Sequence, residues 1–135
     1  MKSHVGVVQM RTSDQLTDNL KYAHTQIQYA ADKGIDLLAF PETFLYIGSD
    51  NQKKHLIAEA LDGAIVETFQ AYAQRYNMSI LMGSIYEKIV DDPERLYNTS
   101  IFINRQGEIA AVYRKIHLFD ALSLGYYESD GIKAG

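Results

Sequence analysis

GIDLLAFPETF, residues 34–44, is the stretch that decides the fold. Between Gly34 and Pro41 it holds a short run that is apolar except for one aspartate. Glycine commonly ends a helix, and proline cannot donate a hydrogen bond to a sheet. Residues 35–40 are therefore predicted to form a buried strand that ends at Pro41. Glu42 follows directly, at the carboxyl end of that strand.

The residues before this strand predict a helix and another strand. One helical face is indicated by apolar residues that recur at steps of four and three: Leu16, Leu20, Ala23, Ile27 and Ala30. Ahead of them, residues 4–10 (HVGVVQM) form an apolar run that is typical of a buried strand. A strand, a helix and a strand in this order predict that the two strands pair in parallel.

The residues after it predict a mixed sheet. A further helical region spans 49–76, and residues 78–84 form a third apolar strand. Two more strands, 96–104 and 108–114, are joined by a hairpin-like turn, which pairs them antiparallel. Residues 116–135 show no periodicity and are predicted to form a loop. The fold class expected is α/β with a mixed sheet.

Composition and charge narrow the range of functions. At 135 residues, 47% hydrophobic and 22% charged, the chain fits one folded domain. Its net charge of -4 offers no basic surface for nucleic acid, so no nucleic-acid partner is expected. Because no apolar run approaches the ~20 residues that span a bilayer, and no secretory signal is recognised, we expect a cytoplasmic protein without a membrane partner.

Three residues are candidates for a catalytic role. Glu42 lies where ligands bind in open α/β sheets, and nearby aromatic residues favour a general base, although a solvated loop carboxylate is the alternative. Lys115 ends a predicted strand and can stabilise an oxyanion, although an exposed strand end also commonly carries a lysine. Glu128 lies in the irregular tail, where positioning groups are often found.

No metal or cofactor is expected. The four histidines, at 4, 24, 55 and 117, show no metal-ligand spacing. The glycines form neither a dinucleotide-binding nor a phosphate-binding motif, and no serine lies in a nucleophile elbow. The sequence contains no cysteine, which excludes a thiol nucleophile among these residues.

The chain resembles the nitrilase superfamily of carbon–nitrogen hydrolases, and most closely its omega-amidase and Nit-like branches. The matching stretches occur in order: VGVVQM, GIDLLAFPETF, LYNTSIFIN, and YRKIHLFD followed by ESD. The resemblance implies the first half of a four-layer α-β-β-α sandwich. It also implies roles for three residues: Glu42 as general base, Lys115 as the catalytic lysine, and Glu128 as the second glutamate that positions substrate and base.

The absence of cysteine is the departure from the family pattern. In the family a cysteine thiolate attacks a small amide or nitrile, and that cysteine follows one further strand beyond the point that matches Gly135. Residues 1–135 are therefore expected to be a partial domain without amidase activity of its own. A shortened gene, a frameshift or an incompletely expressed chain would each produce such a fragment.

Two other interpretations remain open. The chain is alternatively a pseudoenzyme or an interaction module that kept the fold and binds a small carboxamide or a protein. A third possibility is an unrelated α/β domain whose motifs match by chance. If half of a sandwich is absent, open strand edges and apolar faces are exposed, so self-association into a homo-oligomer is expected.

Overall fold

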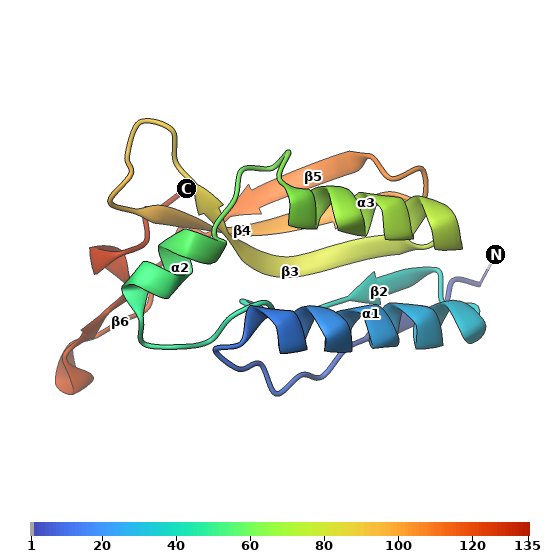
Figure 1. Cartoon of the computed structure of the whole chain (residues 1–135), viewed down its shortest axis with the longest axis horizontal. Helices are drawn as coiled ribbons and strands as arrows, with labels where there is room; N and C mark the ends of the chain where they lie inside the picture. Colours follow the sequence, from blue (N-terminus) through green and yellow to red (C-terminus); the bar gives the residue numbers. More distant parts are fainter. Residues whose placement is uncertain (1) are drawn as a thin grey trace.

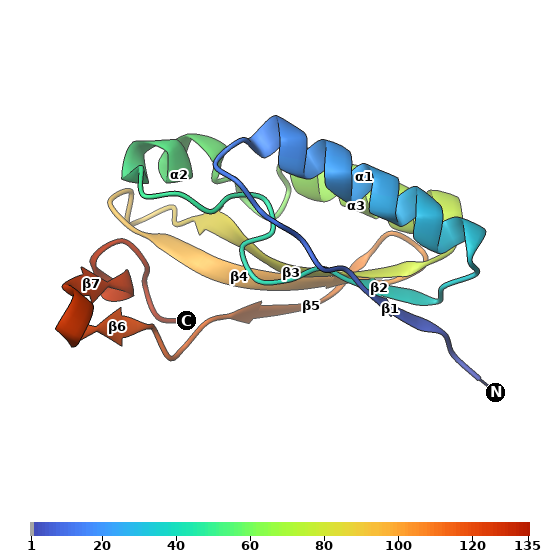
Figure 2. The ribbon, with the colours of Figure 1, turned by 90° about the horizontal axis from the view of Figure 1, so that it is seen from below.

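The computed structural model describes residues 2–135 as a five-stranded sheet with three helices on one of its faces (Figure 1, Figure 2). The strands lie side by side in chain order: β1 (Val5–Val7), β2 (Leu37–Ala39), β3 (Ser79–Lys88), β4 (Leu96–Ile103) and β5 (Ile109–Arg114). The helices are α1 (Leu16–Asp32), α2 (Asn51–Ile57) and α3 (Ala64–Tyr76). The first three strands pair in parallel and the last three antiparallel. The α/β class with a mixed sheet is thereby confirmed.

The segment that was predicted to be a loop contains short regular elements. Within residues 116–135, here called the C-terminal arm, β6 (Asp120–Ala121) pairs with β7 (Tyr126–Tyr127). Two 3₁₀ turns accompany them, η1 (Leu122–Leu124) and η2 (Glu128–Asp130). Strands of two residues are too short to produce a periodic pattern, which is why the sequence indicated only a loop.

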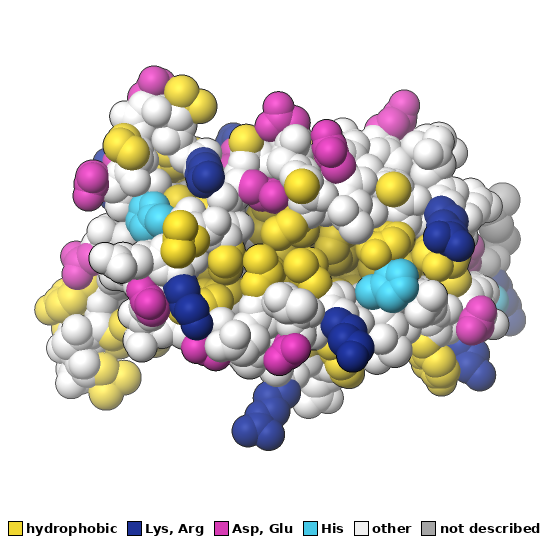
Figure 3. Space-filling model, in the orientation of Figure 1, with side chains coloured by type: hydrophobic (Ala, Val, Ile, Leu, Met, Phe, Trp, Pro, Cys, Tyr) yellow, Lys and Arg dark blue, Asp and Glu magenta, His cyan; other side chains and the backbone are white. Residues whose placement is uncertain are grey.

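The core lies between the sheet and the helices. The sheet contributes buried residues that alternate along its central strands and, at Phe40, directly follow β2: Leu38, Phe40, Ile80, Met82, Ile101 and Ile103. Phe69 of α3 packs edge-on against Phe40 and Phe44, with ring centroids 5.8 and 5.6 Å apart. Hydrophobic side chains also reach the surface in a band between α1 and α3 (Figure 3). The core between the helices and the sheet holds β2 beside β3. It therefore also determines where the end of β2 lies.

On the opposite face of the sheet, residues 2–135 form no second layer (Figure 2). One row of directly paired residues crosses all five strands on this face: Val7, Ala39, Leu81, Phe102 and Ala111. We call this row and its neighbours the open face. The prediction of a buried first strand was wrong, because β1 is an edge strand whose valines point to this face, Val5 59% and Val7 83% exposed.

Candidate functional site

The three residues selected from the sequence meet beyond the carboxyl end of β2. The ammonium nitrogen Nζ of Lys115 lies 3.0 Å from Oε1 of Glu42 and 3.0 Å from Oε2 of Glu128. One cation thus bridges two carboxylates that are far apart in the sequence. The hydrogen bonds from this ammonium group to the two carboxylates are charge-assisted, and such bonds are shorter and stronger than neutral ones.

Glu42 is brought to this place by a close approach of two strands. A side chain at Gly83 of β3 would place its Cβ 2.0 Å from the carbonyl oxygen of Phe40 and 2.3 Å from that of Pro41. Only glycine permits this contact. The register between β3 and β4 also shifts in this region, between Met82 and Ile85. The end of β2 therefore lies directly on β3.

The residue after Glu42 holds a strained backbone conformation. Thr43 has a φ of 47°, in the left-handed region that β-branched residues rarely adopt. Its backbone N–H donates to Oγ of the buried Ser84, at 2.8 Å, and this bond holds the turn in place. Strain maintained by its surroundings is often found at functional sites. The turn directs the Glu42 side chain towards Lys115.

Lys115 and Glu128 are held by the backbone around them. The backbone N–H of Lys115 donates to the carbonyl oxygen of Asn98 in β4, at 2.9 Å. Oε2 of Glu128 accepts from the backbone N–H of Phe119 at 2.6 Å, and the N–H of Glu128 donates back to the Phe119 carbonyl. These two bonds fix Glu128 to Phe119 within the C-terminal arm. Its side chain is only 10% exposed.

Asn98 is a member of the site that the sequence analysis did not select. The residue is 3% exposed, and its Nδ2 donates to Oε1 of Glu42 at 2.8 Å and to Oε1 of Glu128 at 3.5 Å. The available signal was an asparagine, a residue with low strand propensity, inside the strand LYNTSIFI. It lies in a stretch that carried the family resemblance, and no role was assigned to it there.

The electrostatics of the cluster follow from these contacts. The hydrogen bond from Lys115 lowers the pKa of Glu42, burial opposes this, and the bond from Asn98 lowers it further. Burial alone would lower the pKa of Lys115, but the hydrogen bonds to Glu42 and Glu128 outweigh it and raise that pKa. Burial and nearby charges raise the pKa of Tyr86 to about 12. At neutral pH the site therefore holds an ionised Glu42 and a charged Lys115.

An open cleft of about 1310 Å³ gives access to the cluster. Its walls come from α2 and the loop before it, from the loop between β3 and β4, and from the C-terminal arm. These segments lie at the same end of the molecule in both ribbon views (Figure 1, Figure 2). The cleft is large enough for a small organic ligand, and its floor carries Glu42, Asn98 and Lys115.

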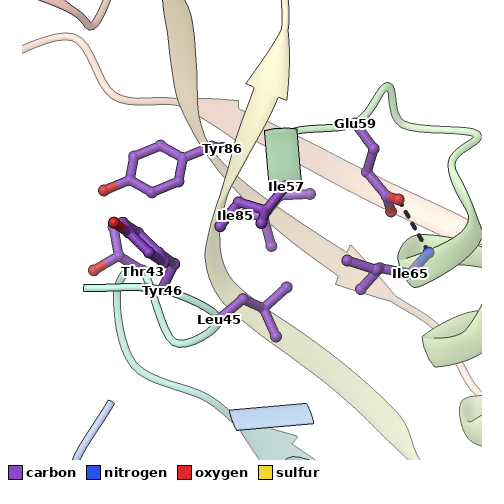
Figure 4. A pocket seen from close by; sticks show the side chains of 8 residues that line it. All are labelled: Thr43, Leu45, Tyr46, Ile57, Glu59, Ile65, Ile85 and Tyr86. Carbon is purple, nitrogen blue, oxygen red and sulfur yellow. Dashed lines mark hydrogen bonds between the residues drawn. The ribbon is translucent and has the colours of Figure 1, made fainter. Parts of the chain in front are cut away.

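Tyr86 and Thr43 also line a second cavity of about 10 Å³, which is no larger than one water molecule requires (Figure 4). Glu59 lies at its far side and points towards the start of α3. The Glu59 carboxylate accepts from the backbone N–H groups of Ile65 (3.2 Å) and Val66 (2.8 Å). Glu59 therefore caps α3, where a negative charge stabilises the helix, and does not belong to the cluster.

Two further findings concern residues 2–135 only. No group of three or more histidine, cysteine, aspartate or glutamate side chains in this part of the chain is arranged to hold a metal ion. No helix among the described residues is long and apolar enough to cross a membrane.

Comparisons with known proteins agree on one family. The family model described as carbon-nitrogen hydrolase matches residues 4–135. Deaminated glutathione amidase of Dictyostelium discoideum is 34% identical over 121 residues, covering 86% of this chain and 42% of the relative. The Synechocystis protein of the same name is 33% identical and covers 95% of this chain and 48% of its own length. This chain therefore spans half the length, or less, of these curated relatives.

Comparison with solved structures supports the same fold. The crystal structure of the Caenorhabditis elegans NitFhit protein superposes with a TM-score of 0.89 at 29% identity, covering all of this chain and 34% of the other. Saccharomyces cerevisiae Nit3, a member of the nitrilase superfamily, gives a TM-score of 0.80 at 25% identity over 97% of this chain and 48% of its own. The helix and sheet layers described above thus match the first half of the nitrilase fold, as predicted.

Proposed function

This chain belongs to the carbon–nitrogen hydrolase family, and from that membership we propose that it supplies the proton-accepting and oxyanion-binding part of an amidase site. The observation that carries the proposal is the bridge from Lys115 to Glu42 and Glu128 at the floor of an open cleft. A fixed carboxylate beside a fixed cation suits amide hydrolysis, because a proton must move while negative charge develops on oxygen.

The roles follow from the surroundings of each group. Glu42 faces the cleft with a side chain that is 59% exposed, so it can reach a nucleophile and act as general base. Lys115 is 25% exposed and keeps its charge, which suits it to stabilise the oxyanion of a tetrahedral intermediate. Glu128 is tied to backbone and lysine, and serves to hold Lys115 in place.

The nucleophile has to come from outside these 135 residues. The chain contains no cysteine, and a serine or threonine hydroxyl attacks poorly at neutral pH unless a base is aligned to it. We therefore expect no hydrolysis by this polypeptide alone. A thiol supplied by further polypeptide at the cleft would complete the site. The substrate class is a small carboxamide, since the relatives in D. discoideum and Synechocystis are named as amidases.

The test is ammonia release from a panel of small carboxamides. The purified chain is expected to release none. A fusion that continues after Gly135 with the unmatched remainder of the D. discoideum relative is expected to release ammonia. In that fusion Glu42→Gln lowers the rate by about 10²–10⁴-fold. Turnover by the unfused chain, or an undiminished rate in the Glu42→Gln fusion, would contradict the proposal, as would a folded fusion without activity.

A second candidate function is a binding module without catalysis. The cleft and its charged floor are present in a chain without a thiol, which favours this alternative. Calorimetric titration of the purified chain with the same carboxamides separates the two. Binding by the chain, together with an inactive folded fusion, supports the module. An active fusion supports the amidase.

The open face leads us to propose that a second copy of this chain binds there. The row from Val7 to Ala111 is apolar on every strand, so two copies can bury it against each other without bringing like charges together. Its five strands, at a spacing of ~4.8 Å, span only roughly 20 Å, which favours a weak dimer over an obligate one.

A further inference from the structure

The two glutamates of the site differ in how many of their oxygens are engaged. In Glu128 both oxygens accept hydrogen bonds: Oε2 from the Phe119 backbone at 2.6 Å, and Oε1 from Lys115 at 3.2 Å and from Asn98 at 3.5 Å. Oε2 also forms an ion pair with Lys115 at 3.0 Å. In Glu42 only Oε1 is engaged, by Lys115 at 3.0 Å and by Asn98 at 2.8 Å. Within residues 2–135, Oε2 of Glu42 has no donor.

Asn98 is suited to maintain this difference. Lysine is a mobile point charge that can follow either oxygen of a carboxylate, and the last torsion of a glutamate is broad. The amide of Asn98, by contrast, is buried in β4, and its strand is paired on both sides, to β3 and β5. Its N–H groups therefore have a fixed direction. Two donors that converge on Oε1 hold the plane of the Glu42 carboxylate.

We propose that Asn98 is a positioning residue that, together with Lys115, occupies Oε1 of Glu42 and leaves Oε2 as the oxygen that accepts the proton. The proposal rests on the proposed function in so far as Glu42 is the base. It excludes Glu128 from that role, because neither oxygen of Glu128 is free. It also gives a role to the asparagine in LYNTSIFI, whose shorter side-chain hydrogen bond goes to Glu42 at 2.8 Å and whose longer one goes to Glu128 at 3.5 Å.

The test uses NMR titration of the chain as it exists, without any need for catalysis. The side-chain carboxyl carbon of Glu42 and the side-chain amide of Asn98 are followed with pH in the wild type and in Asn98→Leu, which has nearly the same shape without a donor. In Asn98→Leu the pKa of Glu42 is expected to rise, because a donor to the ionised form is lost. The matched control is Thr99→Val.

Thr99 is the neighbouring buried residue, but it bonds Glu87 on the other face of β4 at 2.6 Å. The control is therefore expected to lower the melting temperature and to leave the pKa of Glu42 unchanged. An unchanged pKa of Glu42 in a folded Asn98→Leu protein would overturn the proposal. If that variant unfolds, the wild type provides the test. The chemical shifts of the Asn98 side-chain amide protons must change with the titration of Glu42. Shifts that do not change with pH would also overturn the proposal.

The outcomes also separate this proposal from the proposed function. A failed titration with an active fusion removes Asn98 from its role and leaves the amidase intact. A successful titration with an inactive fusion confirms the hydrogen-bond arrangement and removes the reaction that it was to serve.

Discussion

The ammonium group of Lys115 lies 3.0 Å from the carboxylate oxygen Oε1 of Glu42, although 73 positions separate the two residues in the sequence. This contact connects the end of β2 to the end of β5. It links the parallel part of the sheet to the antiparallel part, which otherwise share only β3. Its removal therefore has a consequence for both stability and charge.

Substitution of Lys115 by methionine is expected to leave Glu42 and Glu128 facing each other without a cation. We expect the free energy of unfolding to fall by about 1 kcal/mol, a small value because the Glu42 side chain is more than half exposed. Urea denaturation measures this change. Lys53→Met serves as control, since Lys53 pairs with Asp14 at the surface, and no measurable change is expected there. Equal effects in the two variants would show that the site lysine has no special role.

Stability is expected to depend on pH through the same pair. The pKa of Glu42 is lowered from 4.5, chiefly by Lys115, so its contribution is complete above 4.5 and is lost as the pH falls through the lower folded value. The pKa of Lys115 is raised from 10.5, so its contribution is complete below 10.5 and is lost as the pH rises through the higher folded value. Between roughly pH 5 and pH 10 the contribution of this pair is expected to be constant.

Thermal melts across the pH range measure this profile. Glu42→Gln removes the titrating carboxyl and is expected to reduce the loss of stability at the acid end without changing the shape between neutral pH and pH 9. If the loss of stability at acid pH is as large in that variant as in the wild type, other carboxylates account for all of that loss.

Gly83→Ala tests the close approach that positions Glu42. The new methyl group would collide with the carbonyl oxygens of Phe40 and Pro41, so the end of β2 must move. We expect a loss of about 3 kcal/mol in the free energy of unfolding, measured by urea denaturation. At Gly131 a Cβ meets nothing within 4 Å, and Gly131→Ala is expected to change stability by less than about 0.5 kcal/mol. A tolerated Gly83→Ala would show that β2 does not need this contact.

Val7→Lys tests the association through the open face. Sedimentation velocity of the wild type is expected to show a concentration-dependent increase in mass, and the lysine is expected to abolish it, because a charge would be buried between two apolar faces. Val90→Lys is the matched control, since Val90 is 94% exposed but lies in the turn after β3. A wild type that stays monomeric at all concentrations, or an identical effect of both variants, would contradict the proposed dimer.

Three members of the candidate site could be selected from the sequence. Glu42 and Lys115 each follow a predicted strand, and Glu128 lies in the tail where the sequence pattern shows no periodicity. Asn98 was not predictable in this way. Its partners are 56 and 30 positions away, and nothing in the strand that contains it distinguishes a buried hydrogen-bond donor from a tolerated polar residue. The exposure of β1 was likewise hidden, since an apolar strand that lacks a covering layer has the same sequence as one that has it.

The sequence by itself determined the α/β class, the strand–helix–strand unit around residues 34–44, and the absence of a thiol nucleophile, because these depend on local periodicity and on composition. Only the tertiary structure decided that one lysine bridges two glutamates, that Asn98 joins them, and that one face of the sheet stays open. These features are contacts between distant segments. They arise from strand register and layer packing, which local residue preferences do not specify.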